Sequence, residues 1–270
     1  MLRTEGLRLA YPGQMLVDGL SIEFRPGEVW AVLGRNGSGK STLLHALAAL
    51  RRPEAGNVLL QDAIAAALPR RVLARKIGVL LQEETREFWG SVRDYVLLGR
   101  YPHARSPFGW NVEDERIASQ EIEAMHLRGM GYRPFATLSG GERQRTRAAA
   151  LFAQRPAIYL LDEPLQHLDL PHQVAVLERL SAEARDRGAI VVMVLHDLIF
   201  AARYCNRFLL LFGEGRHSAG QADEALTADH LGELYGFPLV PVEVGGERLF
   251  LPGRQSGEGR MYNPSFHAAT

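Results

Sequence analysis

Residues 34–42, with the sequence GRNGSGKST, constrain the fold more than any other segment of the chain. A glycine, four residues and then Gly-Lys-Ser is the spacing of a phosphate-binding loop, which joins a strand to a helix. The sequence supplies both neighbours, because an apolar run at 29–33 precedes the segment and residues of good helical propensity fill 42–50. The segment therefore predicts a nucleotide-binding α/β fold.

The rest of the chain repeats this alternation of strands and helices. Short apolar runs without polar alternation are typical of strands in a parallel sheet that is covered on both faces. Strands are expected at 7–10, 20–24, 58–63, 76–82, 158–161 and 190–195, and helices at 113–127, 141–154 and 174–185. Residues 241–252 alternate around two glycines and predict a hairpin, whereas residues 253–270 have little to bury and are expected to form a flexible tail.

The charges of the chain balance, with 31 basic and 31 acidic side chains among 270 residues. A neutral chain lacks the field that draws a protein onto nucleic acid, so we expect no nucleic-acid partner. Cys205 has no second cysteine to pair with and lies among apolar residues, which predicts a buried structural thiol in a reducing compartment. No run approaches the ~20 apolar residues that span a bilayer, so membrane attachment is expected only through another chain.

Two acids end an apolar run in the segment IYLLDEP at 158–164. Ligands bind at the carboxyl ends of parallel strands, so Asp162 is expected to hold Mg²⁺ and Glu163 to orient or deprotonate the attacking water. Within the loop, Lys40 is expected to neutralise the β- and γ-phosphates, and Ser41 to offer its hydroxyl to Mg²⁺. The whole loop is predicted to bind the nucleotide, through Gly34, Arg35, Asn36, Gly37, Ser38, Gly39, Lys40, Ser41 and Thr42.

A second anion site is predicted at 137–145, where the sequence is TLSGGERQR. Ser139, Gly140 and Gly141 stand before a helical segment, where free backbone N–H groups and a partial charge of roughly +0.5 favour phosphate. One nucleotide in one chain does not explain two such sites.

In order, the chain presents Tyr11, the phosphate loop, Gln82, the segment 138–144, the two acids, Asp169 and His196. This order resembles that of the ATP-binding subunits of ABC transporters over nearly the whole chain. The resemblance implies an α/β fold with a P-loop ABC-type ATPase core, a mainly parallel sheet, an antiparallel β subdomain and an inserted α-helical subdomain. It further implies a single ATPase domain at 1–252, with the helical subdomain at about 83–150.

The same resemblance implies that two copies of the chain hold ATP between them, which gives the second anion site a use. The signature segment of one copy would face the phosphate loop of the other. Tyr11 would stack on adenine, Gln82 would touch Mg²⁺ and relay the nucleotide state, and His196 would sense the γ-phosphate. The residues that would act in trans on the partner's ATP are Ser139, Gly140, Gly141, Glu142 and Asp169.

Several of these side chains also have a structural explanation. Tyr11 fits an aromatic residue of a Pro-Gly turn, Gln82 fits a solvent-facing side chain at a strand end, and His196 fits a core histidine. Leu165 and Gln166 replace the small polar residues that are usual in the family after Asp-Glu-Pro. This departure leaves the contacts of that loop across the dimer open.

The segments SVRDYVLLGRYPH at 91–103 and LHDLIFAARYCNR at 195–207 resemble the ATPases of importers for iron-siderophores, haem and cobalamin. The closing segment 230–252 is most similar to the cobalamin members. We therefore expect import of cobalamin first, with an iron chelate or haem close behind it. We therefore expect a homodimeric ATPase that uses ATP and Mg²⁺ at the cytoplasmic face of the inner (cell) membrane. Its expected partners are separate permease subunits and, indirectly, a periplasmic or surface substrate-binding protein. The alternative is a soluble ABC ATPase that acts on a protein or nucleic-acid complex.

Phe88 and Trp89 lie beside Gly90 in a segment that is otherwise rich in charges. Aromatic side chains usually fold back onto a core, and that is one explanation for them. Two large aromatics are hard to bury within a short charged loop, so we expect them instead to line a groove that receives a short helix of the permease.

Overall fold

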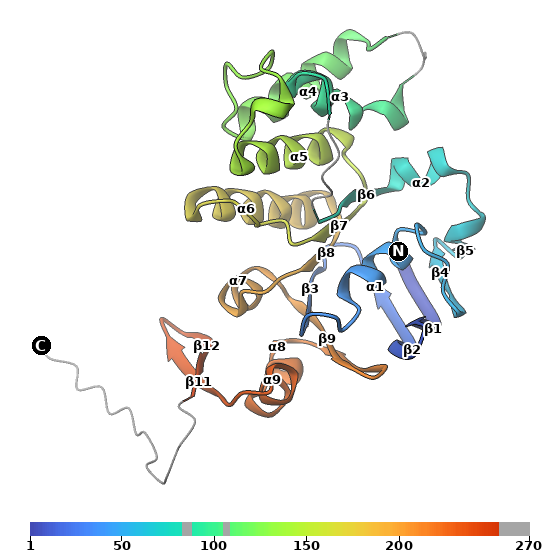
Figure 1. The fold of residues 1–270 in the computed structure, drawn as a ribbon, viewed down its shortest axis with the longest axis vertical. Coiled ribbons are helices and arrows are strands. Elements are labelled where there is room, and N and C mark those ends of the chain that lie inside the picture. The colour runs from blue at the N-terminus through green and yellow to red at the C-terminus, as the bar shows by residue number, and fades with distance from the viewer. Residues whose placement is uncertain (83–87, 105–108, 254–270) are drawn as a thin grey trace, which may run out of the picture.

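The computed structural model describes residues 1–82, 88–104 and 109–253 of the chain (Figure 1). Its strands are β1 (Leu2–Tyr11), β2 (Gln14–Phe24), β3 (Val29–Gly34), β4 (Ala55–Leu60), β5 (Ala63–Ile64), β6 (Ile77–Leu80), β7 (Ile158–Asp162), β8 (Ile190–Val194), β9 (Arg207–Gly213), β10 (Arg216–Gly220), β11 (Leu239–Val244) and β12 (Glu247–Pro252). Its α-helices are α1 (Lys40–Leu47), α2 (Arg70–Lys76), α3 (Val92–Leu98), α4 (Val112–Ala124), α5 (Gly140–Gln154), α6 (Leu170–Arg187), α7 (Leu198–Tyr204), α8 (Ala222–Ala225) and α9 (Ala228–Tyr235). Short 3-10 helices are η1 (Ala65–Ala67), η2 (Tyr101–His103) and η3 (Phe135–Thr137).

The central sheet has the strand order β10-β9-β3-β8-β7-β6. All neighbouring pairs from β9 to β6 are parallel, and β10 is the antiparallel edge strand. Parallel strands require crossover connections, and the helices that make them cover both faces of the sheet. The predicted mainly parallel α/β fold is confirmed.

Two layers of apolar side chains lie on the two faces of this sheet. Along β3, Ala31 and Leu33 belong to the layer that contacts α5 and α6, whereas Trp30 and Val32 belong to the layer that contacts α1. This alternation follows from the two-residue period of a strand, and both sets of side chains are buried. The strand is therefore fully covered, as its unbroken apolar sequence predicts.

The antiparallel sheet has the order β2-β1-β4-β5 and completes the second apolar layer. Phe24 and Leu7 from this sheet share that layer with Leu43 and Leu44 of α1. β1 and β2 are longer than the predicted runs at 7–10 and 20–24, because exposed residues lie between the buried ones and interrupt the apolar pattern. The predicted antiparallel β subdomain is confirmed.

Helices α3, α4 and α5 form the upper part of the molecule in Figure 1. Each begins with a capping box, in which the residue before the helix and the third helical residue bond each other's backbone: Ser91 with Asp94, Asn111 with Asp114, and Ser139 with Glu142. This arrangement confirms an inserted helical subdomain. Its boundaries at about 83–150 stay a prediction, since residues 83–87 lie outside the described part and α5 continues to Gln154.

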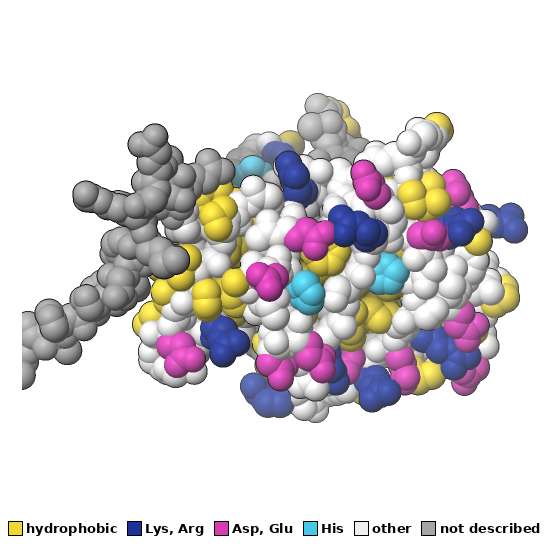
Figure 2. Space-filling model, turned by 90° about the horizontal axis from the view of Figure 1, so that it is seen from below, with side chains coloured by type: hydrophobic (Ala, Val, Ile, Leu, Met, Phe, Trp, Pro, Cys, Tyr) yellow, Lys and Arg dark blue, Asp and Glu magenta, His cyan; other side chains and the backbone are white. Residues whose placement is uncertain are grey.

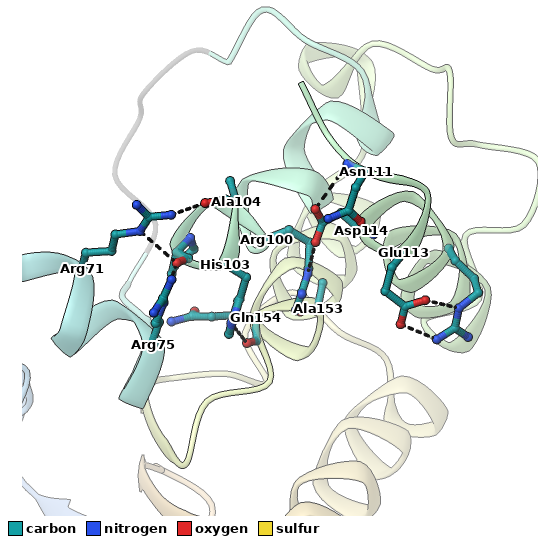
Figure 3. Close-up of polar contacts among 12 residues, drawn as sticks. Arg71, Arg75, Arg100, His103, Ala104, Asn111, Glu113, Asp114, Ala153 and Gln154 are labelled. Carbon is teal, nitrogen blue, oxygen red and sulfur yellow. Dashed lines mark hydrogen bonds and ion pairs between the residues drawn. The ribbon is translucent and has the colours of Figure 1, made fainter. Parts of the chain in front are cut away.

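Polar contacts join the helical part to α2 and to itself (Figure 3). Arg75 donates to the carbonyl of Pro102 at 2.8 Å, and Arg71 reaches the same carbonyl at 3.3 Å. Arg100 and Asp114 form a buried ion pair at 2.9 Å, and the same guanidinium donates to the carbonyl of Ala153 in α5. These contacts lock η2, α4 and α5 together.

The remaining predictions concern the C-terminal part and the thiol. β11 and β12 pair antiparallel around Gly245 and Gly246, whose φ angles of 60° and 83° suit a tight hairpin turn. This confirms the predicted hairpin, while the expected tail lies outside the described residues from 254 onward.

Cys205 is buried, as expected, and burial raises the pKa of its thiol. Over the described residues, no helix has both the length and the apolar character to cross a membrane.

Candidate nucleotide-binding site

Four predicted functional segments meet at one edge of the central sheet. β3 ends at Gly34, where the phosphate loop begins, and β7 ends at Asp162. β8 and β6 each end two residues before a predicted polar side chain, His196 and Gln82 respectively. These strands are mutually parallel, so their carboxyl ends lie on the same side of the sheet.

The phosphate loop needs glycine for steric reasons at two of its positions. Gly39 has a φ of 100°, and a Cβ built there would lie 2.8 Å from the Cβ of Leu16. A Cβ at Gly34 would lie 2.7 Å from the carbonyl oxygen of Leu211 in β9. Any side chain at these positions would force the backbone of the loop to move.

Lys40 is the first residue of α1 and is 7% exposed. Its Nζ donates to the carbonyl oxygens of Gly34 at 2.8 Å and Arg35 at 3.0 Å. Burial lowers the pKa of Lys40, and the nearby carboxylates of Glu163 and Asp162 oppose this effect. The ammonium group is thus held beneath the loop, and its neutralisation of β- and γ-phosphates stays a prediction.

A cavity of about 300 Å³ lies against this loop and gathers residues that the sequence singled out separately. Tyr11 enters it from the end of β1, Gln82 from the segment after β6, and Glu163 from the end of β7. Its lining consists of Tyr11, Leu16, Asn36, Gly37, Gly39, Lys40, Ser41, Thr42, Gln82 and Glu163. No motif in the sequence identified Leu16, whose Cβ lies too close to Gly39 for a side chain there.

Asp162 has the surroundings that a Mg²⁺ ligand needs. Burial raises the pKa of its carboxyl group, and a hydrogen bond with Ser41 acts in the opposite direction. Its Oδ1 is buried and, within the described residues, has no hydrogen-bond partner. A carboxylate oxygen left unpaired beside a hydroxyl fits Mg²⁺, which prefers oxygen ligands. The ion, when bound, would neutralise phosphate charge.

Ser38 adds a second unsatisfied group to the loop. Its hydroxyl oxygen is buried and has no hydrogen-bond partner within the described part of the chain. A buried hydroxyl without a partner is costly, and a phosphate oxygen would accept its hydrogen bond. The loop and Asp162 therefore fit a magnesium-bound nucleotide.

Glu163 is held through both carboxylate oxygens. Its Oε1 lies 2.7 Å from Nε2 of His196, and its Oε2 accepts a hydrogen bond of 3.0 Å from Nε2 of Gln166. The backbone at Glu163 has a φ of 50°, in the left-handed region that non-glycine residues seldom adopt. The structure therefore brings both predicted catalytic residues together, and it adds Gln166, to which the sequence analysis gave no catalytic role.

Tyr11 is half-exposed at the rim of the cavity, and Arg51 stacks on it. The Arg51 guanidinium carbon lies 4.1 Å from the ring centroid. Hydrogen bonding with Thr42, and then with Arg51, lowers the pKa of the Tyr11 hydroxyl. Tyr11 lines the nucleotide cavity while Arg51 lines a separate depression, so the ring lies between the two. Its stacking on adenine stays a prediction.

The signature residues lie at the beginning of α5 and line no part of the described cavity. Ser139 accepts a hydrogen bond from the amide of Glu142, and the Ser139 amide donates to the Glu142 carboxylate at 2.7 Å. That amide bond lowers the pKa of Glu142. A Cβ at Gly141 would lie 3.0 Å from the carbonyl of His167 and one at Gly140 3.4 Å from its Cβ, so small residues suit this contact. Action in trans stays a prediction.

Asp169 is exposed and caps the N-terminus of α6. Its Oδ1 accepts from the amide of His172 at 3.4 Å and also contacts the His172 ring. Hydrogen bonding to the His172 side chain lowers the pKa of Asp169. The carboxylate therefore has partners in its own chain, and its contact across a dimer stays a prediction.

Two side chains of α5 connect the signature helix to the edge of the sheet. Gln144 is buried and donates to the carbonyl of Pro164 at 2.9 Å, directly after Glu163. Arg147 donates to the carbonyl of Leu81, the residue before Gln82. The sequence analysis missed both links. The three-residue spacing of Gln144 and Arg147 on one helix was the available signal, but it did not identify their partners.

Phe88 and Trp89 occupy different environments. Phe88 packs edge-on against Tyr95 at 5.1 Å and Phe135 at 5.7 Å between ring centroids. Trp89 is 87% exposed. The argument that both are hard to bury is therefore wrong for Phe88, because two aromatic rings of the helical part receive it. Contact of either residue with a permease stays a prediction.

Comparison with known proteins agrees with this geometry. The family model described as ABC transporter matches residues 17–166. The chain is 37% identical to the ferric enterobactin transport ATP-binding protein FepC of Escherichia coli, over 93% of each chain. It is 39% identical to the hemin import ATP-binding protein HmuV of Pseudomonas fluorescens, over 90% of this chain and 95% of that protein.

Solved structures give the same result. A transporter assigned to the metal-chelate type of ABC transporters, in an inward-facing conformation, matches with a TM-score of 0.80 and 29% identity, over 94% of this chain and 98% of that one. A bacterial ABC transporter cassette solved as a dimer matches with a TM-score of 0.72 and 25% identity, over 81% and 98%. The family match extends over more than half of the chain, and its phosphate loop, acids and histidine meet in one site. The chain therefore belongs to the ABC transporter family, as an ATP-hydrolysing ATP-binding subunit.

Proposed function

We propose that this chain powers the import of an iron chelate, either a ferric siderophore or haem, through a separate membrane permease. The observation that carries the proposal is that Lys40 and Glu163 line one cavity, with Asp162 directly before Glu163 at the end of β7. The relatives of the chain are named for ferric enterobactin and hemin import. The site supplies the ATP chemistry, and the relatives supply the substrate class. The substrate itself would not touch this subunit.

In this proposal the working unit is a homodimer at the cytoplasmic face of the cell membrane. The signature helix lies outside the cavity of its own chain, as a role at the partner's nucleotide requires. Two ATP molecules would be bound between the copies, each with a Mg²⁺ held by Ser41, Asp162 and Gln82. Closure of the dimer would reach the permease through Trp89, which is exposed beside the helical part.

The proposal is tested by reconstituting the chain in vesicles with its permease subunits and substrate-binding protein. A ferric siderophore, haem and cobalamin are supplied in separate arms, with ATP inside or outside the vesicles. We expect ATP-dependent uptake of a ferric siderophore or haem. Uptake of none of the three, or uptake that does not require ATP, would contradict the proposal.

Cobalamin is the second candidate substrate, because the closing segment 230–252 is similar to that of cobalamin importers. In the structure this segment forms α9 and the β11–β12 hairpin. Neither element contributes to the described nucleotide cavity, so the resemblance carries no chemistry of recognition. Uptake of cobalamin alone in the reconstitution would assign the chain to that group instead.

The alternative of a soluble ABC ATPase that acts on a protein or nucleic-acid complex is not favoured. Basic and acidic side chains are interspersed over the face shown in Figure 2. Nucleic-acid binding surfaces instead gather basic side chains into a patch or stripe. A pull-down of the full-length chain from membranes should recover a polytopic permease, and recovery of a nucleic-acid complex in its place would favour the alternative.

A further inference from the structure

The turn that follows Glu163 brings a second polar side chain to its carboxylate. The amide of Gln166 donates to the carbonyl of Glu163 at 3.2 Å, which closes a tight turn with Pro164 at its second position. Leu165, at the third position, is 9% exposed and belongs to the apolar core. With Leu165 directed inward, the Gln166 side chain lies against Glu163, and its Nε2 donates to Oε2 at 3.0 Å.

This turn is fixed from a second direction. Gln144 of the signature helix donates to the carbonyl of Pro164 at 2.9 Å, and both its side chain and Pro164 are buried. The Glu163 backbone is held in the left-handed region, which persists only where the surroundings impose it. The contact between Gln166 and Glu163 thus rests on a supported segment of backbone.

During hydrolysis the two partners of the Glu163 carboxylate must behave differently: His196 must leave its oxygen, whereas Gln166 can stay. A general base needs one oxygen free to accept a proton, yet here Oε1 faces His196 and Oε2 faces Gln166. If His196 senses the γ-phosphate, its ring leaves Oε1 when ATP binds. The Gln166 side chain, in contrast, makes no other hydrogen bond within the described part of the chain, and its Nε2 donates to Oε2.

We propose that Gln166 is a positioning residue that holds Oε2 of Glu163 so that Oε1 faces the attacking water once His196 has turned to the γ-phosphate. In that step a proton of the water passes to Oε1, the resulting hydroxide oxygen bonds to the γ-phosphorus, and the bond to the β–γ bridging oxygen breaks to release ADP. The inference goes beyond the proposed transport function, and it depends on Glu163 acting as the base and on His196 turning to the γ-phosphate. It also gives a role to a residue that departs from the small polar residue usual at this position.

The test compares three substitutions in the full-length chain. Gln166→Met conserves the side-chain volume and removes the hydrogen-bond donor. Gln166→Ala removes the volume and the donor together, and Gln166→Glu replaces the donor with a second carboxylate. We expect Gln166→Met and Gln166→Ala to lower kcat by about tenfold each, with KM for ATP unchanged within about twofold. Gln166→Glu should lower kcat further, because like charges would force the Glu163 carboxylate out of position.

Gln173→Met is the matched control. Gln173 is a half-buried glutamine that contacts the same turn. Its side chain donates to the carbonyl of Leu165 at 3.4 Å and, among the residues that the structure describes, hydrogen-bonds to no carboxylate. This variant should keep kcat. Thermal unfolding and ATP-dependent dimerisation are measured for each variant, since Gln166 lies three residues before Asp169.

Two results would overturn the inference. If Gln166→Met keeps normal kcat while Gln166→Ala loses it, Gln166 only fills space. If kcat falls together with dimerisation, Gln166 acts on the dimer contact and not on Glu163. Glu163→Gln serves as the reference: if it retains turnover, the assignment of the base fails, whereas an inactive Glu163→Gln beside a normal Gln166→Met contradicts only this inference.

Discussion

Glu163 is the residue at which the structure and the proposed chemistry meet most closely. Its carboxylate lines the nucleotide cavity, contacts His196 and follows the acid that fits Mg²⁺. Glu163→Gln conserves shape and removes the charge that polarises water, so ATP should still bind and turnover should fall by about 10²–10⁴-fold. The same variant should accumulate as an ATP-bound dimer in size-exclusion chromatography. Glu178→Gln, an exposed change on α6, is the control, and near-normal turnover of Glu163→Gln would refute the assignment.

Substitution of Lys40 should weaken the binding of ATP, whereas substitution of Glu163 should slow its hydrolysis. Lys40→Ala removes a buried ammonium group beside the loop carbonyls, and loss of its charged hydrogen bonds to phosphate should weaken ATP affinity about 10- to 100-fold. Equilibrium binding of a fluorescent ATP analogue measures this effect. The other lysine of the chain, Lys76, lines no part of the described cavity, and Lys76→Ala should bind normally. Equal affinities in the two variants would argue against the loop.

At this scale the sequence predicted the residues better than their contacts. The phosphate loop and the two acids follow from spacing and from apolar runs, because such motifs are local in the chain. Gln166 and Arg51 were not assigned roles, since their partners depend on a turn and on the packing of β1 against the segment after α1. Phe88 was misjudged for the same reason, because its aromatic partners are distant in sequence.

Among the elements, the start of η2 is joined to α4 by an ion pair that has little access to water. Arg100 and Asp114 are 8% and 2% exposed, and Arg100 also bonds the carbonyl of Ala153. Asp114→Ala leaves the guanidinium buried without its counter-ion and should lower the free energy of unfolding by about 3–5 kcal/mol. Denaturant-induced unfolding followed by circular dichroism measures this change.

An exposed ion pair on the same helix, between Glu113 and Arg116, supplies a control for that prediction. Glu113, labelled beside Asp114 in Figure 3, pairs with Arg116 on the exposed surface of the helix, so Glu113→Ala should change stability little. The double change Arg100→Met, Asp114→Leu removes both charges and should recover most of the lost stability. A loss in the double variant as large as in Asp114→Ala would show that the pair is not the cause.

Element types were more predictable than element ends. Strands β3, β6, β7 and β8 of the central sheet and helices α4, α5 and α6 follow from apolar runs and helical periodicity, whereas the buried strand β9 was not predicted. α6 nevertheless begins at Leu170 rather than at 174, because Asp169 caps it and a proline fits its first turn. Short helices such as α2 and α3 carry too few turns to show a period, so the sequence did not reveal them.

Across the whole molecule, the exposed Trp89 bears on the link to a permease. Trp89→Ala should leave ATP affinity and thermal stability nearly unchanged, because its side chain is 87% exposed, and should weaken permease association or uncouple transport from hydrolysis. Phe88→Ala is the contrast, since loss of a packed ring should lower the unfolding temperature. Normal transport by Trp89→Ala together with a markedly lower unfolding temperature would assign Trp89 to the core.

The central claim is that one ATP site is built from two chains. Two variants, each with a single defect, test this claim. Ser139→Arg places bulk and a misplaced charge at the signature, and Lys40→Ala disables the phosphate loop. Each variant alone should be nearly inactive. In a mixed dimer, however, the intact signature of the Lys40→Ala chain faces the intact loop of the Ser139→Arg chain.

The decisive measurement is the ATPase rate of an equimolar mixture of these two variants after dissociation and reassociation. Half of the dimers should be mixed, and each should carry one complete site of two, so the rate should recover to about a quarter of the wild-type value. Thermal unfolding first confirms that Ser139→Arg is folded, because Ser139 also caps α5. A mixture no more active than the two separate variants would contradict assembly of the site in trans.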